Sequence, residues 1–173
     1  MRQKIIIPFL ILLSFTIIPS YGQSIVQIQK PMDVPISEIR NMAENIQNYK
    51  IFPKNIKSIE VLKETENSKL VKIEFGSNGI FINTLVRHIE ITDTLHRIDL
   101  LSGDLEGTVI LASFEKTWGY DGTPGEGTIV NMKVIPRVSG VLSFFGIVSD
   151  DLIRYSIDTT LFTLENHLKN HKV

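Results

Sequence analysis

Two pairs of histidines have a spacing that could support chemistry. His88 and His96 lie on neighbouring predicted strands, on either side of the turn 92–94, where a cross-strand pair could bind a metal or transfer a proton. No third ligand is fixed beside them, so we interpret both as exposed hairpin residues. His167 and His171 are four residues apart and share one helix face, a spacing found in metal sites. They lie near the end of the chain, where helices fray, and we interpret them as part of a solvated tail.

Five charged side chains lie nearest the centres of the predicted strands: Arg87, Glu90, Arg97, Asp99 and Glu106. A buried acid or base among them could polarise a carbonyl group of a substrate. Their signs alternate, however, and cross-strand ion pairs on the outer face of a sheet explain them without catalysis. We therefore predict no catalytic residue.

Motifs of the common catalytic and phosphate-binding sites do not occur in the sequence. There is no Gly-x-Ser-x-Gly, no His-Glu-x-x-His and no glycine loop that opens a helix. The glycine-rich stretch 119–127 joins two predicted strands, so we interpret it as a hairpin loop. The chain contains no cysteine, which excludes disulfides, thiolate chemistry and zinc–sulfur sites. We predict neither a metal nor a cofactor.

The first residues, 1–22, have the pattern of a secretory signal peptide. Arg2 and Lys4 precede the uncharged run Ile5–Ile18, and small residues follow up to a predicted cleavage site after Gly22. The apolar run is shorter than the roughly 20 residues of a membrane-spanning helix. We predict a secreted or extracytoplasmic protein, with an uncleaved signal that anchors the chain to a membrane as the alternative.

The remaining residues, 24–173, are predicted to form a single domain. About 150 residues suffice for one sizeable core, and no internal repeat, linker or low-complexity stretch divides them. The full chain has 18 basic and 19 acidic side chains. This nearly neutral balance gives no electrostatic reason to expect nucleic acid as a partner. We make no prediction of the oligomeric state.

The elements that would position these residues are mostly strands. A first strand covers residues 24–30, a short helix begins at Asp33–Pro35, and a second short helical segment covers 49–53, where Pro53 ends it. Six further strands are predicted at 56–63, 70–75, 80–91, 95–101, 108–118 and 127–136. The turns between them are short, which indicates antiparallel neighbours.

A long amphipathic helix is predicted to follow the strands. Ser149 can cap it, with Asp150 and Asp151 at its positive end. One apolar stripe recurs at spacings of three and four residues, formed by Ile153, Ile157, Leu161, Leu164 and Leu168. A single helix cannot cover so many strands unless the sheet curls around it. We therefore predict an α+β helix-grip fold, in which a curved antiparallel sheet of about seven strands wraps around the carboxy-terminal helix, with two short helices after the first strand.

Two strand faces are predicted to point toward this helix. One holds Val130, Met132 and Val134, and the other holds Phe114 and Trp118 together with smaller apolar residues. Trp118 could line a cavity or fill the core. We predict a ligand-binding wall formed by Phe114, Trp118, Val130, Met132, Val134, Ile153, Ile157 and Leu161.

An apolar run, Val141–Val148, separates the last strand from the long helix. It could act as a lid or make transient membrane contact while a ligand exchanges. The alternative interpretation is a buried turn that packs under the sheet.

The order of elements and five short motifs resemble the START-like (SRPBCC, helix-grip) superfamily, which includes the polyketide cyclase/dehydrase and coenzyme Q-binding families. The matching stretches are Pro31–Ile39, Tyr49–Ile56, Gly103–Gly107, Trp118 and Gly125–Val130. The resemblance covers essentially the whole predicted domain. It implies a cavity between sheet and helix for a lipid, quinone, polyketide or hormone.

Three functions follow from this interpretation. The first is an exported, non-enzymatic carrier of a small hydrophobic molecule, in which apolar side chains supply affinity and a few polar groups set orientation. The second is a cyclase or dehydratase acting on aromatic or polyketide-like substrates, which requires a charged or histidine side chain that points into the cavity. The third is an envelope protein without a cavity that displays a surface to partners.

Overall fold

The computed structural model describes residues 24–45, 48, 56–77, 80–140 and 149–170. Seven strands and two helices follow one another along this part of the chain. They are β1 (Val26–Met32), α2 (Ile36–Glu44), β2 (Ile56–Thr65), β3 (Ser68–Ser77), β4 (Ile80–Thr92), β5 (Leu95–Leu100), β6 (Val109–Trp118), β7 (Pro124–Ile135) and α4 (Asp150–Asn170).

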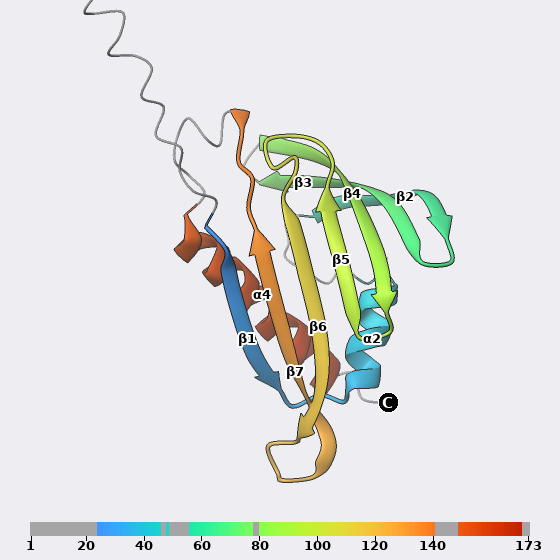
Figure 1. Ribbon diagram of the computed structural model, residues 1–173, viewed down its shortest axis with the longest axis vertical. Helices are drawn as coiled ribbons and strands as arrows, with labels where there is room; N and C mark the ends of the chain where they lie inside the picture. Colours follow the sequence, from blue (N-terminus) through green and yellow to red (C-terminus); the bar gives the residue numbers. More distant parts are fainter. Residues whose placement is uncertain (1–23, 46–47, 49–55, 78–79, 141–148, 171–173) are drawn as a thin grey trace, which may run out of the picture.

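All seven strands form one antiparallel sheet in the order β1-β7-β6-β5-β4-β3-β2. The sheet is curved, and both helices lie against the same face of it, α4 beside β1 and β7, and α2 near β6 and the start of β5 (Figure 1). The strands β2 to β7 follow one another as hairpins, and only β1 joins the sheet out of chain order. The predicted α+β helix-grip fold is confirmed.

The predicted boundaries of the strands agree with the observed ones to within about three residues. Alternation of apolar and polar side chains explains this agreement, because one face of the sheet is buried and a strand has a period of two. The last strand begins earlier than predicted, at Pro124 and not at residue 127. Pro124 lies opposite Trp118 across an irregularity in the β6–β7 pairing, so the ladder continues past the predicted turn.

The long helix α4 begins as predicted. The Leu152 backbone N–H donates to the Ser149 hydroxyl across 3.2 Å, and Asp150 and Asp151 lie in the first turn. At its other end, Leu161 and Leu164 are buried, and Ile157 and Leu168 pack against the same cluster. The apolar stripe of α4 therefore does face the sheet.

Buried apolar side chains form two separate clusters on the concave face. The first joins β1, β6 and β7 with α2 and α4, and includes Met32, Ile39, Phe114, Val130 and Leu161. The second lies on β2, β3 and β4, and consists of Ile59, Val71, Ile73 and Val86, with Ile56, Ile98 and Leu100 packed against it.

Several predicted features lie outside the described residues. These are the signal segment 1–22, the second short helical segment 49–53, the apolar run Val141–Val148 and His171. They remain predictions.

Candidate functional site

One row of residues on the concave face changes from apolar to polar across the sheet. In an antiparallel ladder, directly opposed residues point to the same side. Val134 opposes Ile110, Ile110 opposes Ile98, Ile98 opposes His88, and His88 opposes Lys69. The row therefore starts with three aliphatic side chains and ends with an imidazole and an ammonium group. Along this row, a polar site on β3 and β4 follows an apolar stretch on β5, β6 and β7.

His88 and His96 form a buried pair at this boundary. His88 Nε2 lies 2.9 Å from His96 Nδ1, and the two rings stack with centroids 5.1 Å apart and an angle of 12° between their planes. Their exposed fractions are 5% and 2%. The prediction that both are exposed hairpin residues is wrong. Glu90 opposes His96 and Ile98 opposes His88, so the two rings are diagonal neighbours on the concave side.

The environment keeps both imidazoles neutral near pH 7. Burial, together with the nearby His96 and Lys69, lowers the pKa of His88 to about 4. Burial also lowers the pKa of His96, against the opposing influence of Glu90, the Asp93 backbone and Glu44. In a neutral pair one ring nitrogen donates and the other accepts. If both rings were charged, two N–H groups would face each other across the 2.9 Å contact and would repel each other.

Arg40 of α2 lies close to the same pair. Its Nη2 pairs with Asp93 Oδ2 at 3.0 Å, in the turn that connects β4 and β5, and its charge contributes to lowering the pKa of His96. The ring of His96 also contacts Phe114, at 5.3 Å between ring centroids. His96 of β5 thus contacts β4 through His88 and β6 through Phe114, and it lies near α2 through Arg40.

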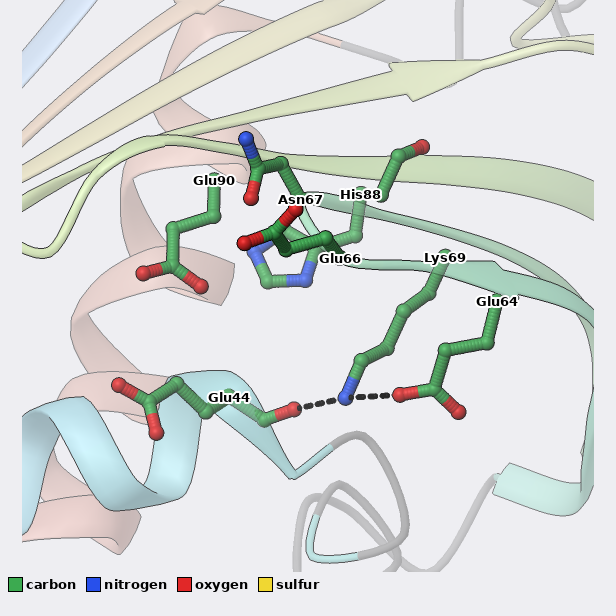
Figure 2. Close-up of a pocket in the computed structure, with 8 residues that line it drawn as sticks. Glu44, Glu64, Glu66, Asn67, Lys69, His88 and Glu90 are labelled. Carbon is green, nitrogen blue, oxygen red and sulfur yellow. Dashed lines mark hydrogen bonds and ion pairs between the residues drawn. The ribbon is translucent and has the colours of Figure 1, made fainter.

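A polar cleft of about 320 Å³ opens beside His88. Figure 2 shows Lys69 extending between the backbone oxygen of Glu44 and the carboxylate of Glu64, with hydrogen-bonding distances of 2.7 and 3.0 Å. The complete lining is Glu44, Glu64, Glu66, Asn67, Ser68, Lys69, His88 and Glu90. Four carboxylates against one ammonium group make this cleft acidic.

The strand charges divide between the two faces of the sheet. Arg97 and Asp99 form an ion pair of 2.7 Å, and they occupy positions between those of the inward-facing His96, Ile98 and Leu100. The prediction of outer ion pairs is met only in part, because both side chains point outward but the pair joins two residues of the same strand and does not cross between strands. For Glu90 the prediction of an outer position is wrong, because it follows His88 by two residues and lines the same cleft.

The predicted apolar wall is buried as expected, with one exception. Phe114, Val130, Val134 and Leu161 are each no more than 7% exposed. Met132 and Ile157 pack against the first cluster, and Ile153 is half-buried. Their contact with a ligand stays a prediction.

Trp118 is the exception, because 64% of it is exposed. The interpretation as a core residue is wrong. The pairing of β6 with β7 shifts between Thr117 and Trp118, but the extra residues, 125 and 126, belong to β7, so this shift does not turn Trp118 to the other face of β6. The residue lies toward the tip of the β6–β7 hairpin, which extends beyond the helices (Figure 1).

Glu165 is a buried residue that the sequence analysis missed. Its Oε1 accepts the Asp33 backbone N–H at 3.0 Å and pairs with Lys169 at 3.0 Å. Lys169 also pairs with Asp33 and lies over the ring of Tyr120. The network ties the end of α4 to the start of α2 and to the β6–β7 hairpin. The sequence contained a signal for this burial, because Glu165 lies four residues after Leu161 and therefore on the inner side of the helix.

The described residues offer no other obvious site. They contain no group of three or more His, Asp or Glu side chains that could hold a metal ion, and His167 is half-buried on α4. Among the same residues, no helix is both long and apolar enough to cross a membrane.

Comparison with solved structures identifies the fold. The chain is similar to protein TTHA0849 from Thermus thermophilus, with a TM-score of 0.69 and 15% identity over 87% of this chain and 100% of the other. A START superfamily protein from Mycobacterium smegmatis gives a TM-score of 0.63 and 12% identity, over 84% and 97% of the two chains. The Zhui aromatase/cyclase from a Streptomyces species gives a TM-score of 0.54 and 12% identity, over 84% and 93%.

No protein-family model and no curated protein sequence matches the chain. At identities this low, the structural similarity shows the fold alone. The chain has a START-like, helix-grip fold.

Proposed function

We propose that this protein binds a small hydrophobic molecule with a polar end and carries it without changing it chemically. The concave face supports this proposal most directly. Two apolar clusters lie on the same side of the sheet, and the buried pair of His88 and His96 lies on β4 and β5, where the two clusters approach each other. An elongated apolar molecule that contacts Ile98 and Val86 would meet the histidines at one end. Lipid, quinone and polyketide-like molecules all have this character.

Burial of apolar area supplies the affinity in such a site, at about 25 cal/mol per Å² removed from water. A few polar groups then fix the orientation. The START-like neighbours are consistent with a site of this kind. The histidine pair would supply the orientation here, because its imidazoles are neutral and cost less to desolvate than charged groups.

Native mass spectrometry of the gently purified full chain tests the proposal. We expect an added mass that solvent extraction releases as an apolar molecule. Ile98→Trp should fill part of the concave face and reduce the amount recovered. Ile89→Trp is the matched control, because Ile89 lies one residue from His88 and points to the opposite face. An empty protein with a filled interior would contradict the proposal and favour an envelope protein that displays a surface to partners.

Acid–base catalysis is a second candidate function, which the inward-facing histidines favour. The cyclase or dehydratase alternative requires such a side chain, and a neutral imidazole can accept a proton from the carbon next to a carbonyl. The products of that step are an imidazolium and an enolate. Deuterium exchange at the α-carbon of 2-tetralone, followed by NMR, tests it: the wild-type protein should accelerate exchange and His88→Gln/His96→Gln should not. Equal rates with both proteins would exclude this candidate.

The proposal includes export, on the basis of the signal pattern in residues 1–22. Cell fractionation should find the protein outside the cytoplasm, and mass spectrometry of its amino terminus should find Gln23 as the first residue. Recovery of the intact leader in a membrane fraction would instead support the uncleaved anchor. Transient membrane contact through Val141–Val148 stays a prediction.

A further inference from the structure

Two buried nitrogen atoms near the histidine pair have no hydrogen-bond partner among the residues that the structure describes. They are Arg40 Nε and His96 Nε2. Leaving a buried donor or acceptor unpaired costs about 1–3 kcal/mol, and the large majority of buried side-chain polar atoms in folded proteins are paired. Two unpaired atoms in one region of the fold therefore point to a missing partner.

Each of the two side chains is held by a contact through another of its nitrogens. Arg40 is held by its Nη2 contact with Asp93, and Asp93 belongs to the turn directly before β5. His96 is the second residue of β5 and is held through Nδ1 by His88. Both open nitrogens thus belong to side chains that are anchored at the interface between α2 and the start of β5.

We propose that Arg40 Nε and His96 Nε2 together receive an uncharged oxygen atom of the bound molecule, a carbonyl or hydroxyl oxygen. The Nε–H of an arginine can only donate, so the partner must accept. A carbonyl oxygen also accepts from His96 when Nε2 carries the proton. A hydroxyl group instead donates to His96 when the proton is on Nδ1. The hydrogen bond to His88 can adapt to either arrangement, because each ring can donate or accept.

The charges around the site disfavour a carboxylate. Glu90 and Glu44 are close enough to His96 to oppose the lowering of its pKa by burial, and the charge of Arg40 is already compensated by Asp93. An additional negative charge would face repulsion with little compensation. The inference rests on the proposed function and narrows its ligand class to ketones, quinones, enols and alcohols with an apolar body. Hydrocarbons and fatty-acid anions are excluded.

A pair of fluorescent probes tests this inference on the full chain. The first is 6-propionyl-2-dimethylaminonaphthalene, which has a ketone, and the second is 2-dimethylaminonaphthalene, which lacks it. We expect the wild-type protein to bind the ketone at least about tenfold more tightly, because the analogue leaves both nitrogens unpaired. Arg40→Met should remove this preference, because it should weaken the binding of the ketone probe and leave the binding of the analogue unchanged. Arg87→Met is the control, since Arg87 is exposed on the opposite face of the sheet and should keep the preference.

Nitrogen-15 NMR of the wild-type protein provides a measurement that does not depend on a variant that folds. The Arg40 Nε–H signal should shift when the ketone binds and stay in place with the analogue. Equal affinities for both probes, or an Arg40 signal that reports a trapped water molecule even with the ketone bound, would overturn the oxygen site while leaving hydrophobic binding intact. If neither probe binds, the proposed function itself fails as well.

Discussion

His88 Nε2 and His96 Nδ1 lie 2.9 Å apart in the interior of the domain, with their rings stacked. This contact requires that at least one of the two facing nitrogens carries no proton. Protonation of both imidazoles would break it in a region that is shielded from water. The stability of the fold is therefore linked to the protonation state of this pair.

The first prediction concerns the stability of the protein as a function of pH. The pKa of His88 is about 4 in the folded protein and about 6.5 in an unfolded chain. Between these values the unfolded state binds more protons, so the free energy of unfolding falls as the pH is lowered from about 6.5 to about 4. Each pKa unit corresponds to 1.36 kcal/mol, so His88 alone should account for about 3 kcal/mol. Urea unfolding at a series of pH values measures this loss.

The control for this measurement is a comparison between variants. Carboxylates also titrate toward pH 4, so the wild-type slope must be compared with that of His88→Leu, which should be shallower. His167→Gln should retain the wild-type slope, because it leaves the buried pair intact. Identical slopes for all three proteins would contradict the linkage.

The second prediction concerns the coupling between the two histidines. Either His88→Leu or His96→Phe leaves one buried imidazole nitrogen without its partner, which should cost about 1–3 kcal/mol. The double variant replaces both partners with apolar groups and should be more stable than the sum of the single effects implies. A double-mutant cycle of unfolding free energies should give a coupling of about 1–2 kcal/mol. Additive effects would mean that the contact contributes nothing.

Sequence reasoning found the sheet and the long helix because both depend on simple periodicity. Every second residue of β7 from Val130 to Val134 faces the core, and Leu161 and Leu164 recur at helical spacing. These patterns are local, so they could be predicted without knowing which strands are neighbours. The same reasoning identified the buried apolar wall, although not whether a ligand contacts it.

The polar site could not be predicted in the same way, because it depends on pairing between strands and on α2. His88 and Glu90 alternate with Arg87 and Ile89, and the strand β4 has mixed polarity on both faces. Only the observed register places His88 opposite Ile98, on the buried side. The exposure of Trp118 could not be predicted for a related reason, because it depends on how far the β6–β7 hairpin extends beyond the helices (Figure 1).

The third prediction concerns the buried carboxylate of Glu165. Glu165→Ala removes the acceptor for the Asp33 backbone N–H and one of the two carboxylates that pair with Lys169, so it should destabilise the fold by about 2–4 kcal/mol. Glu165→Gln keeps an oxygen that can accept the same N–H and should recover part of this loss. Thermal or urea unfolding measures both variants. If Glu165→Ala and Glu165→Gln both lowered the free energy of unfolding only slightly and equally, the hydrogen bond to Asp33 would have no role in holding α4.

The fourth prediction concerns Trp118, the single tryptophan of the chain. Because the residue is 64% exposed, its fluorescence should resemble that of indole in water and should be quenched efficiently by acrylamide. Trp118→Ala should change the free energy of unfolding by no more than about 0.5 kcal/mol, as expected for an exposed position. Phe114→Ala provides the contrast, because the loss of a buried ring should cost about 3–5 kcal/mol. A shift of the Trp118 emission to shorter wavelength when an apolar molecule is added would show that the ligand changes the environment of the hairpin. Protection from acrylamide in the unliganded protein would instead contradict the exposed position of Trp118.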